Sequence, residues 1–507
     1  MARNPSRAQP LQRGHYRENA NERSKPHDRF RDCTEIKHAS LFRSNDLLAR
    51  AVYIRIWTSV CYVTVRGLEL AFNLSYESTL HGGGLTLNAR LFVRRSLLVC
   101  EQRLWVWPDW WRSLELDKYD SAEALIRVQK PERPVLGVRP HTAAKAARWF
   151  LNNFPGDIAY AYKANSSVFL LGALYGAGIH HFDVASLAEL EDAVTIPGVH
   201  LHFMHPVKSR LAIRRAYELG VRTFSLDSED ELKKIHEETG QAKDLSLFVR
   251  IAVPSKNSRI PLERKFGIAG AKAARLLVKT RQVAEQLGIC FHVGSQTTTP
   301  DAYLTAMAEV HKLIVKAGVV VDRIDVGGGF PARYPDSNPA PMISFVEAIK
   351  AGLETMPVRE DVRLMCEPGR ALVAEAESLI VRVDARRGDD LFINDGAYGT
   401  LYDAAHLGFI FPTRLVSRTV DVNEPMIPYS FYGPTCDSID FMKGPFVLPA
   451  SIVEGDYIEI GNIGAYGRAI GGKFNGYGSY EEVILLDEPM LTVYGDDSVT
   501  GDEAARA

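Results

Sequence analysis

Eight short apolar runs alternate with helical patterns between about residues 140 and 375, and this alternation constrains the fold more than any other feature of the chain. The runs have the length and composition of strands, and the stretches between them have helical periodicity. Eight repeated strand and helix units predict a closed (β/α)8 barrel. We expect strands at 158–162, 181–184, 200–204, 222–226, 245–253, 289–293, 323–326 and 362–366. We expect helices at 166–177, 186–195, 208–219, 228–239, 271–287, 301–317 and 343–354.

The sequence after the predicted barrel has a different character. From about residue 375, β-rich runs are separated by turn residues with few helical patterns, which predicts a separate β-domain. Strands are expected there at 378–383, 391–394, 446–448, 456–460 and 481–486. The predicted fold class is therefore α/β, a (β/α)8 barrel with a C-terminal β-domain. We expect a segment joining the β-domain at 118–138, the barrel at 139–373, the β-domain at 374–495 and a disordered tail at 496–507.

Residues 1–117 form an N-terminal extension in which no period of 2 or 3.6 persists. A polar start, rich in arginine and asparagine, is followed by four closely spaced tryptophans, Trp105, Trp107, Trp110 and Trp111. We expect this extension to be poorly ordered, or to be translated from upstream of the true start codon. Peptides from before residue 100 in the purified native protein would contradict the second explanation.

The composition excludes several classes of function. A formal net charge of −2 gives no general attraction to nucleic acid or to an anionic membrane. The most apolar early segment, Leu47 to Val65, contains Arg50 and Arg55, so we expect no membrane span. Six scattered cysteines without a C-x-x-C pair, and a start without a secretory signal, favour a reducing cytoplasm. The expected partner is a small molecule, and we assign no metal ligands.

Polar residues mark the carboxyl ends of the predicted strands, where barrel enzymes place their chemistry. In chain order they are Lys163, Asp183, His205, Asp227, Arg250, His292, the glycines 327 to 329 and Glu367. Helix capping explains an aspartate at such a position, but it does not explain a lysine, an arginine, a histidine and a glutamate. Lys163 follows the apolar run 158–162, and a desolvated lysine amine is a Schiff-base nucleophile.

Two neighbouring motifs predict a phosphate site. The backbone amides of Gly327–Gly329 follow a strand and can approach an anion closely, although a tight turn is the alternative interpretation. Arg370 is placed to supply a bidentate cation. Glu367 ends an apolar strand and therefore needs a cationic partner, which is either a pyridinium nitrogen or Arg370. His292 either stacks on a cofactor ring or is an ordinary core histidine.

From about residue 118 to 490 the chain resembles the bacterial-type, fold-type III pyridoxal-phosphate decarboxylases of basic amino acids, the ornithine/lysine decarboxylase group, whose barrel is alanine racemase-like. The motifs that carry the resemblance are Tyr162-Lys163-Ala164-Asn165, His292-Val293-Gly294-Ser295, Asp325-Val326-Gly327-Gly328-Gly329-Phe330, Glu367-Pro368-Gly369-Arg370 and Gly433-Pro434-Thr435-Cys436-Asp437. The resemblance implies that Lys163 holds pyridoxal 5′-phosphate through an imine, that Glu367 pairs with the ring nitrogen and that His292 stacks on the ring. The other cofactor-binding residues that it implies are Asp183, Arg250, Ser295, Gly328, Gly329, Gly369, Arg370 and Tyr466.

The same resemblance implies a homodimer with shared active sites, in which Cys436 and Asp437 come from the other subunit. Cys436 would return a proton to the substrate, while Tyr402, Asp403 and Asp437 would bind the substrate, the two carboxylates receiving its distal ammonium. The implied reaction is the decarboxylation of L-ornithine to putrescine in polyamine biosynthesis. L-lysine, which would give cadaverine, differs by one methylene, worth only about 1–3 kcal/mol in a pocket. We do not expect agmatine as the main product.

Each alternative function differs from this prediction in a sequence feature. Racemases of this barrel type keep the pyridine nitrogen unprotonated with an arginine, where this chain has Glu367. Diaminopimelate decarboxylase requires an arginine and a Cys-Glu motif, where this chain has Cys436 and Asp437. A catalytically inactive regulatory homologue would be expected to lose cofactor residues such as Lys163. Gln296 replaces a glycine of many eukaryotic relatives, and we expect this departure to have no mechanistic weight.

Overall fold

The computed structural model describes residues 116–256, 258–262 and 265–495, together with the backbone of four short strands earlier in the chain. The chain divides into two compact units, Met1–Arg103 and Leu104–Ala507. In the first unit the described strands form two antiparallel hairpins, which the sequence pattern does not predict: β1 (Cys61–Val65) with β2 (Leu68–Phe72), and β3 (Tyr76–His81) with β4 (Gly84–Ala89). The remainder of the predicted extension up to residue 115 and the predicted tail at 496–507 lie outside the described residues.

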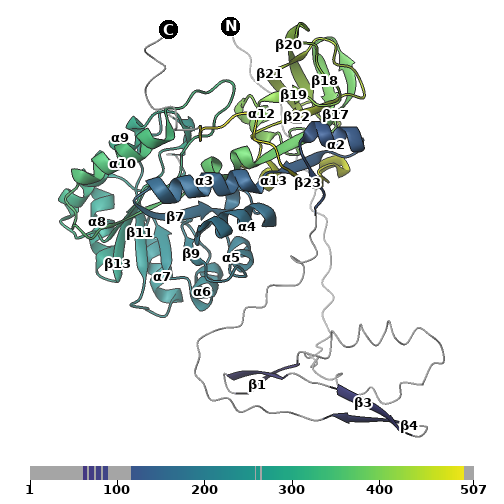
Figure 1. The fold of residues 1–507 in the computed structure, drawn as a ribbon. Helices are drawn as coiled ribbons and strands as arrows, with labels where there is room; N and C mark the ends of the chain where they lie inside the picture. The colour runs from purple at the N-terminus through teal and green to yellow at the C-terminus, as the bar shows by residue number, and fades with distance from the viewer. Residues whose placement is uncertain are drawn as a thin grey trace, which may run out of the picture. The chain divides into compact units, whose positions relative to one another are not determined.

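The second unit contains a closed parallel barrel of eight strands, which confirms the predicted fold (Figure 1). The strands are β7 (Gly156–Ala161), β8 (His181–Val184), β9 (His200–Phe203), β10 (Thr223–Leu226), β11 (Ser246–Arg250), β13 (Gln286–Cys290), β15 (Arg323–Asp325) and β16 (Arg363–Cys366). Each strand pairs in parallel with the next, and β16 closes the barrel by pairing with β7. Most strand residues are buried, as expected when side chains fill the barrel and helices cover it.

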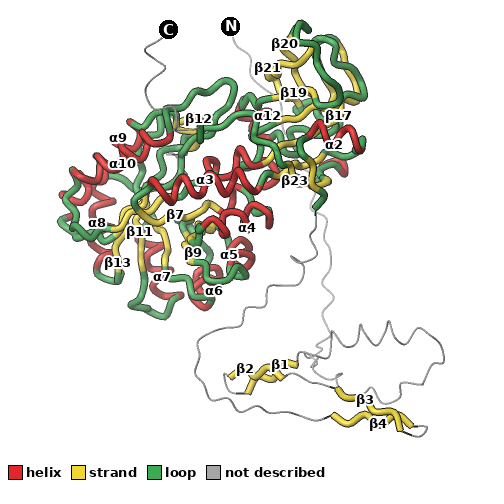
Figure 2. Tube along the Cα trace, in the orientation of Figure 1, coloured by secondary structure: helices red, strands yellow, loops and turns green. Residues whose placement is uncertain are grey.

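Helices alternate with the strands and surround the barrel (Figure 2). They are α3 (Pro140–Asn153), α4 (Val168–Ala177), α5 (Leu187–Ala193), α6 (Arg210–Glu218), α7 (Glu229–Glu238), α8 (Gly270–Arg281), α9 (Asp301–Ala317) and α10 (Met342–Glu354). Serine side chains fix where three of them begin, because each hydroxyl accepts a first-turn N–H that has no other partner: Ser186, Ser209 and Ser228. In the part of the chain that the structure describes, no helix is both long and apolar enough to span a membrane.

The largest differences from the predicted barrel elements lie at β11 and β13, where the predicted strands 245–253 and 289–293 and the predicted helix 271–287 all end earlier. The predicted helix 271–287 ends at Arg281, and its last residues instead enter β13, which begins at Gln286. Parallel pairing with β11 decides this boundary, since the apolar residues there are buried equally well in a helix or in a central strand. The predicted strand 245–253 ends at Arg250, beyond which only an isolated bridge continues the pairing.

A mixed sheet follows the barrel in the chain, in the order β21-β20-β18-β17-β6-β23-β5, with β22 pairing with β17 and β19. Its strands are β17 (Glu377–Arg387), β18 (Asp390–Ile393), β19 (Thr413–Leu415), β20 (Met426–Tyr432), β21 (Phe441–Pro449), β22 (Tyr457–Ile460) and β23 (Glu481–Leu485). Two strands from before the barrel, β5 (Lys118–Tyr119) and β6 (Val135–Val138), also belong to it. The sequence pattern does not predict β19 or β20. We propose the boundary between barrel and sheet at residues 373–374.

Short elements complete the second unit. β12 (Ser258–Ile260) and β14 (Ser295–Thr297) form a small antiparallel pair beside the barrel. The short α-helices are α2 (Ala122–Val128), α11 (Arg370–Val373), α12 (Tyr402–Leu407) and α13 (Gly467–Ile470). Single turns of 3₁₀ helix lie at η2 (Tyr162–Ala164), η3 (Ala374–Ala376) and η4 (Phe474–Gly476).

A buried ion-pair network joins the start of α3 to the sheet. Arg139 is fully buried, and its Nη2 lies 2.8 Å from Glu459 Oε1 and 2.8 Å from Asp487 Oδ1. Arg414 pairs with the same two carboxylates, at 2.6 and 2.9 Å. Because a buried charge is costly without a partner, the carboxylates of Glu459 and Asp487 compensate the charge of Arg139 where the chain passes from β6 into α3.

Candidate active site

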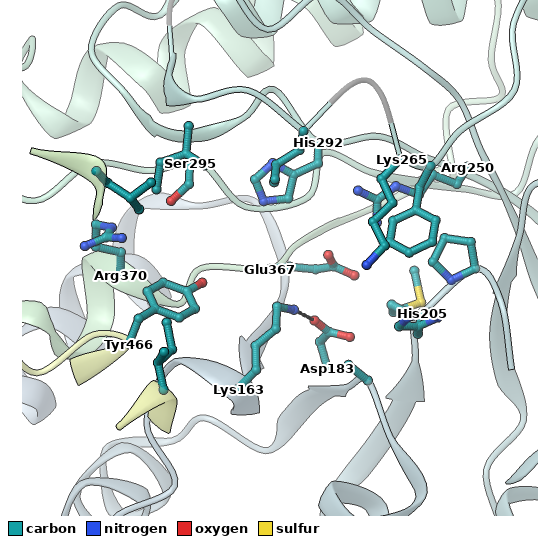
Figure 3. Close-up of a pocket in the computed structure, with 18 of the residues that line it drawn as sticks. Lys163, Asp183, His205, Arg250, Lys265, His292, Ser295, Glu367, Arg370 and Tyr466 are labelled. Atoms are coloured by element: carbon teal, nitrogen blue, oxygen red, sulfur yellow. Dashed lines mark hydrogen bonds and ion pairs between the residues drawn. The ribbon is translucent and has the colours of Figure 1, made fainter. Parts of the chain in front are cut away.

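A cavity of about 420 Å³ lies at the carboxyl ends of the barrel strands, and a smaller cavity adjoins it (Figure 3). Together they are lined by all the residues for which cofactor binding is predicted: Lys163, Asp183, Arg250, His292, Ser295, Gly328, Gly329, Glu367, Gly369, Arg370 and Tyr466. In Figure 3, Ser295, Arg370 and Tyr466 lie along one side, and His205, Arg250 and Lys265 lie along the other. Residues far apart in sequence therefore form one site, as barrel geometry requires.

Lys163 follows β7 and points into this cavity, where Glu367 lies close by (Figure 3). Its Nζ donates a hydrogen bond to Asp183 Oδ2 at 2.6 Å, and its side chain is 44% exposed. Burial lowers the pKa of Lys163, but Asp183, Tyr466 and Glu367 raise it more, so that the pKa lies above its ordinary value. In this arrangement Lys163 is therefore an ammonium, and it must lose a proton before it can act as a nucleophile.

His292 is uncharged. Its Nδ1 accepts a hydrogen bond from the Gly294 N–H at 3.0 Å, so the proton of the neutral ring lies on Nε2. Burial lowers the pKa of His292 to about 3, and the cations Arg250 and Lys163 add to the effect. A neutral, planar ring at the wall of the cavity can stack on an aromatic cofactor.

Glu367 needs a positively charged or donating partner. Burial raises its pKa well above the ordinary value, and the carboxyl groups of Asp325 and Asp183 raise it further. Its Oε1 is buried and has no hydrogen-bond donor among the described residues. The alternative prediction, an ion pair with Arg370, is wrong because the guanidinium of Arg370 pairs with Asp403 instead. A pyridinium N–H fits this environment.

The glycine-rich loop and Arg370 form a cradle that fits a phosphate. Gly329 has φ of +111°, and an added Cβ would lie 2.6 Å from the Gly294 carbonyl oxygen, so only glycine lets the two loops approach so closely. Arg370 donates to Tyr334 Oη and to Asp403 Oδ2, each at 2.9 Å, while its buried Nε has no partner among the described residues. An anion in the smaller cavity would meet backbone amides and an incompletely satisfied guanidinium.

Gln296 has a structural role, and its lack of mechanistic weight stays a prediction. Its φ is +56°, in the left-handed region that favours glycine. The buried amide donates through Nε2 to the Ala332 carbonyl at 2.5 Å and accepts the Ala332 N–H at 3.0 Å. It therefore holds the loop that contains Ser295 against the segment that follows the three glycines.

The predicted substrate residues divide into two groups. Tyr402 and Asp403, at the start of α12, line the larger cavity. Asp403 is 5% exposed and pairs through Oδ2 with Arg370, a contact that the sequence does not predict. Cys436 and Asp437 line neither cavity of this chain. Cys436 is exposed and donates from Sγ to Asn475 Oδ1 at 3.2 Å, and Asp437 accepts from the Tyr398 hydroxyl at 2.5 Å.

Several residues of the site are absent from the predicted cofactor and substrate ligands, although His205 is among the polar residues predicted at strand ends. His205 and Lys265 line the cavity, and Tyr334 supports Arg370. Asp325 lies behind Glu367, fully buried at the end of β15. The one signal for Asp325 in the sequence is an acidic residue at the end of an apolar strand, directly before the glycine run.

Comparison with known proteins gives one consistent family. Residues 141–374 match the pyridoxal-binding domain of the pyridoxal-dependent decarboxylases. A lysine/ornithine decarboxylase from Selenomonas ruminantium is 29% identical over 342 residues, which cover 66% of this chain and 84% of that protein. A diaminopimelate decarboxylase from Pseudomonas fluorescens is 31% identical over 375 residues, covering 69% and 86%. The crystal structure of the arginine decarboxylase of Paramecium bursaria Chlorella virus, bound to agmatine, has a TM-score of 0.64 and 26% identity, covering 71% of this chain and 98% of that one.

The barrel, the cavity at its carboxyl end and these similarities define a pyridoxal-phosphate-dependent enzyme. The chain belongs to the fold-type III decarboxylases of basic amino acids. Its cofactor is pyridoxal 5′-phosphate, and the buried carboxyl group of Glu367, which lines both cavities, and the glycine cradle fit that group. The names of the similar proteins differ in substrate, so membership of the family leaves the choice of amino acid to the residues of this chain.

Proposed function

We propose that this enzyme decarboxylates L-ornithine to putrescine and carbon dioxide in polyamine biosynthesis, and that L-lysine is a second substrate. The observation that carries the proposal is the position of Asp403, whose buried carboxylate lies in the wall of the cavity that contains Lys163 and Glu367. A carboxylate there favours a substrate that ends in a simple ammonium group. Diaminopimelate carries a second carboxylate, which Asp403 would repel.

In this proposal the cofactor residues have separate tasks. Pyridoxal 5′-phosphate, when bound, supplies an electron sink for the charge left at the α-carbon as carbon dioxide departs. Lys163 Nζ is the amine that would hold the cofactor, and Asp183, at 2.6 Å, orients it. Glu367 would accept from the ring nitrogen, and neutral His292 would stack on the ring. The phosphate would be surrounded by Ser295, Gly328, Gly329, Gly369, Arg370 and Tyr466.

Asp403 can serve both the phosphate side and the substrate side of the cavity. Arg370 occupies its Oδ2, while Oδ1 has no hydrogen-bond donor among the described residues. We assign Oδ1 to the distal ammonium of the substrate, with Tyr402 beside it in the cavity wall. Because one extra methylene changes binding by only about 1–3 kcal/mol, both ornithine and lysine are expected to react.

The proposal includes a homodimer with shared active sites. Cys436 and Asp437 lie outside the cavities of their own chain, and the exposed position of Cys436 is compatible with a role in a partner's site. There Cys436 would return a proton to the α-carbon, and Asp437 would be the second carboxylate at the distal ammonium. A cytoplasmic location stays a prediction, with which the free thiols of Cys290, Cys366 and Cys436 are compatible.

A substrate panel tests the reaction. Purified protein loaded with pyridoxal 5′-phosphate is incubated with ornithine, lysine, arginine or diaminopimelate, and the amine or amino acid product is identified. Lys163→Ala serves as the blank. We expect putrescine and cadaverine. Agmatine as the main product would contradict the proposed preference for a simple ammonium, lysine as the main product would contradict the assignment of Asp403, and a protein without a cofactor absorption band would favour the inactive regulatory homologue.

Mixing two inactive variants tests the shared site. Lys163→Ala and Cys436→Ala lie on different sides of the proposed composite site, so a mixed dimer contains one intact site and one doubly altered site. Random exchange of subunits should restore about a quarter of the wild-type sites, because half of the dimers are mixed. Activity that stays at the level of the separate variants would contradict the contribution of Cys436 from the partner.

A further inference from the structure

A second carboxyl group lies directly behind Glu367. Asp325 is the last residue of β15, and Glu367 follows the neighbouring strand β16. Two backbone hydrogen bonds join the segments: the Val326 N–H donates to the Met365 carbonyl at 2.9 Å, and the Glu367 N–H donates to the Gly327 carbonyl at 2.8 Å. Asp325 is fully buried and Glu367 is 8% exposed. The neighbouring strands β15 and β16 therefore hold two buried carboxyl groups close together.

The two carboxyl groups each have a buried oxygen atom that lacks a hydrogen-bond donor within the part of the chain that the structure describes, and one proton between them would supply it. Asp325 Oδ1 accepts the Gly327 N–H at 2.9 Å. Asp325 Oδ2 and Glu367 Oε1 are both buried, and neither has an N–H or O–H donor from any other described residue. One proton shared between these two oxygens would satisfy both of them, whereas two carboxylates, which can only accept, would leave both unpaired. Glu367 also lines the cavity, which leaves its Oε2 for a ligand.

The surroundings keep this proton on the pair at neutral pH. Burial raises the pKa of Asp325 to about 7, although the contact with Glu367 lowers it, while burial, Asp325 and Asp183 all raise the pKa of Glu367, so that without a cofactor the proton resides on Glu367. The cation of Arg250 lowers the pKa of Asp325, and the cation of Lys163 lowers the pKa of Glu367. The titratable groups that face the pair from the neighbouring strands are Lys163 after β7, Asp183 on β8, Arg250 on β11, Cys290 on β13 and Cys366 on β16. Two adjacent buried carboxyl groups cannot both ionise without severe repulsion.

We propose that Asp325 is a positioning residue, which would hold this proton once the cationic ring nitrogen of the cofactor faces Glu367 and would donate a hydrogen bond to Glu367 Oε1, so that Glu367 is a carboxylate toward that nitrogen. The inference rests on the proposed function, in which Glu367 pairs with that nitrogen. Donation from Asp325 stabilises the Glu367 carboxylate and lowers its basicity, so the second proton stays on the ring nitrogen. Without this donor, a buried Glu367 is a stronger base and takes the proton from the ring.

Two substitutions separate donation from mere packing. Asp325→Asn keeps a donor toward Glu367 and an acceptor toward the Gly327 N–H, whereas Asp325→Ala removes both. Glu375→Gln is a matched control, since burial also raises the pKa of Glu375 to about 7, but its carboxylate accepts from the Thr492 hydroxyl at 2.6 Å and the Val493 N–H at 2.7 Å and lines neither cavity.

The readout is the ¹⁵N chemical shift of the ring nitrogen in protein loaded with pyridoxal 5′-phosphate labelled at that atom. Asp325→Asn and Glu375→Gln should keep the pyridinium shift of the wild type, and Asp325→Ala should move the shift toward that of neutral pyridine. Because a hydrogen bond to a charged group is lost, Asp325→Ala should also weaken cofactor binding about 10- to 100-fold. A wild-type shift in Asp325→Ala, or equal losses in the Asn and Ala variants, would overturn the proposal.

Two further measurements keep the test decisive. If Asp325→Ala does not fold, the infrared band of protonated carboxyl groups should lose intensity in Asp325→Asn relative to the wild type, and an unchanged band would overturn the proposal. Glu367→Gln tests the assignment on which the inference rests. If Glu367→Gln leaves the ring shift unchanged, the proposed role of Glu367 fails; if it changes the shift while Asp325→Ala does not, only the role of Asp325 fails.

Discussion

Replacing Gly329 with alanine would test the phosphate cradle directly. Gly329 has φ of +111°, and the added Cβ would lie 2.6 Å from the Gly294 carbonyl oxygen and 2.8 Å from Val293 Cγ2. The nearer atom belongs to the backbone, so the side chain cannot be accommodated by a change of rotamer. Gly294 directly precedes Ser295, and a shift of this loop would displace proposed phosphate ligands on both sides of the cradle.

A second glycine separates the cost of the backbone conformation from the cost of the contact. Gly220 has φ of +95°, and no atom lies within 4 Å of an added Cβ, so Gly220→Ala measures the positive φ alone, about 1–2 kcal/mol. Gly329→Ala adds an overpacked contact worth about 1–3 kcal/mol. The free energy of unfolding should therefore fall by about 2–5 kcal/mol in Gly329→Ala. The loss of one phosphate hydrogen bond would weaken cofactor binding about 10- to 100-fold.

Urea unfolding and titration of the apoprotein with pyridoxal 5′-phosphate, followed by absorbance, measure the two quantities. Gly220→Ala should bind the cofactor with wild-type affinity. The reasoning is refuted if Gly329→Ala loses no more stability than Gly220→Ala and binds the cofactor as tightly as the wild type, because the close approach of the two loops would then have no role in holding the phosphate.

Three other predictions concern residues outside the cradle. Gln296→Gly keeps the positive φ but removes both hydrogen bonds to Ala332, so the free energy of unfolding in urea should fall by about 1–3 kcal/mol. An unchanged unfolding midpoint would contradict a stabilising role of these two hydrogen bonds. Glu459→Ala removes one carboxylate partner of the buried Arg139 and should lower the free energy of unfolding by about 3–5 kcal/mol in the same assay. A decrease no larger than that of a surface substitution would contradict a stabilising role of this ion-pair network. Burial and the adjacent His181 hold the pKa of His202 well below 6.5 in the folded state. Below pH 6.5 the unfolded chain therefore binds a proton at this histidine that the folded chain does not bind. The free energy of unfolding should fall by up to about 1.4 kcal/mol for each pH unit below 6.5. The slope of stability against pH between 6.5 and 5 should be smaller in His202→Asn, and equal slopes would exclude this contribution.

The fold could be predicted from the sequence because its elements are encoded locally. The predicted strand 181–184 and the predicted helix 301–317 agree with β8 and α9 residue for residue. Periodicity, capping serines and apolar runs depend only on residues that are close in the sequence, so they can be recognised without the structure. The prediction fails at 271–287, where an apolar segment suits a helix and a central strand equally and parallel pairing makes the choice.

The candidate site also combines features that the sequence predicts with features that only the fold creates. The sequence by itself determined which chemistry is present, since Lys163, Glu367 and the glycine run are read from motifs at strand ends. Only the tertiary structure decided which groups lie together: Asp403 pairs with Arg370, Asp325 lies on the strand next to Glu367, and Gln296 bonds to the loop beyond the glycines. Each pair joins segments that are distant along the chain, so its geometry depends on strand order and loop packing, which no local pattern specifies.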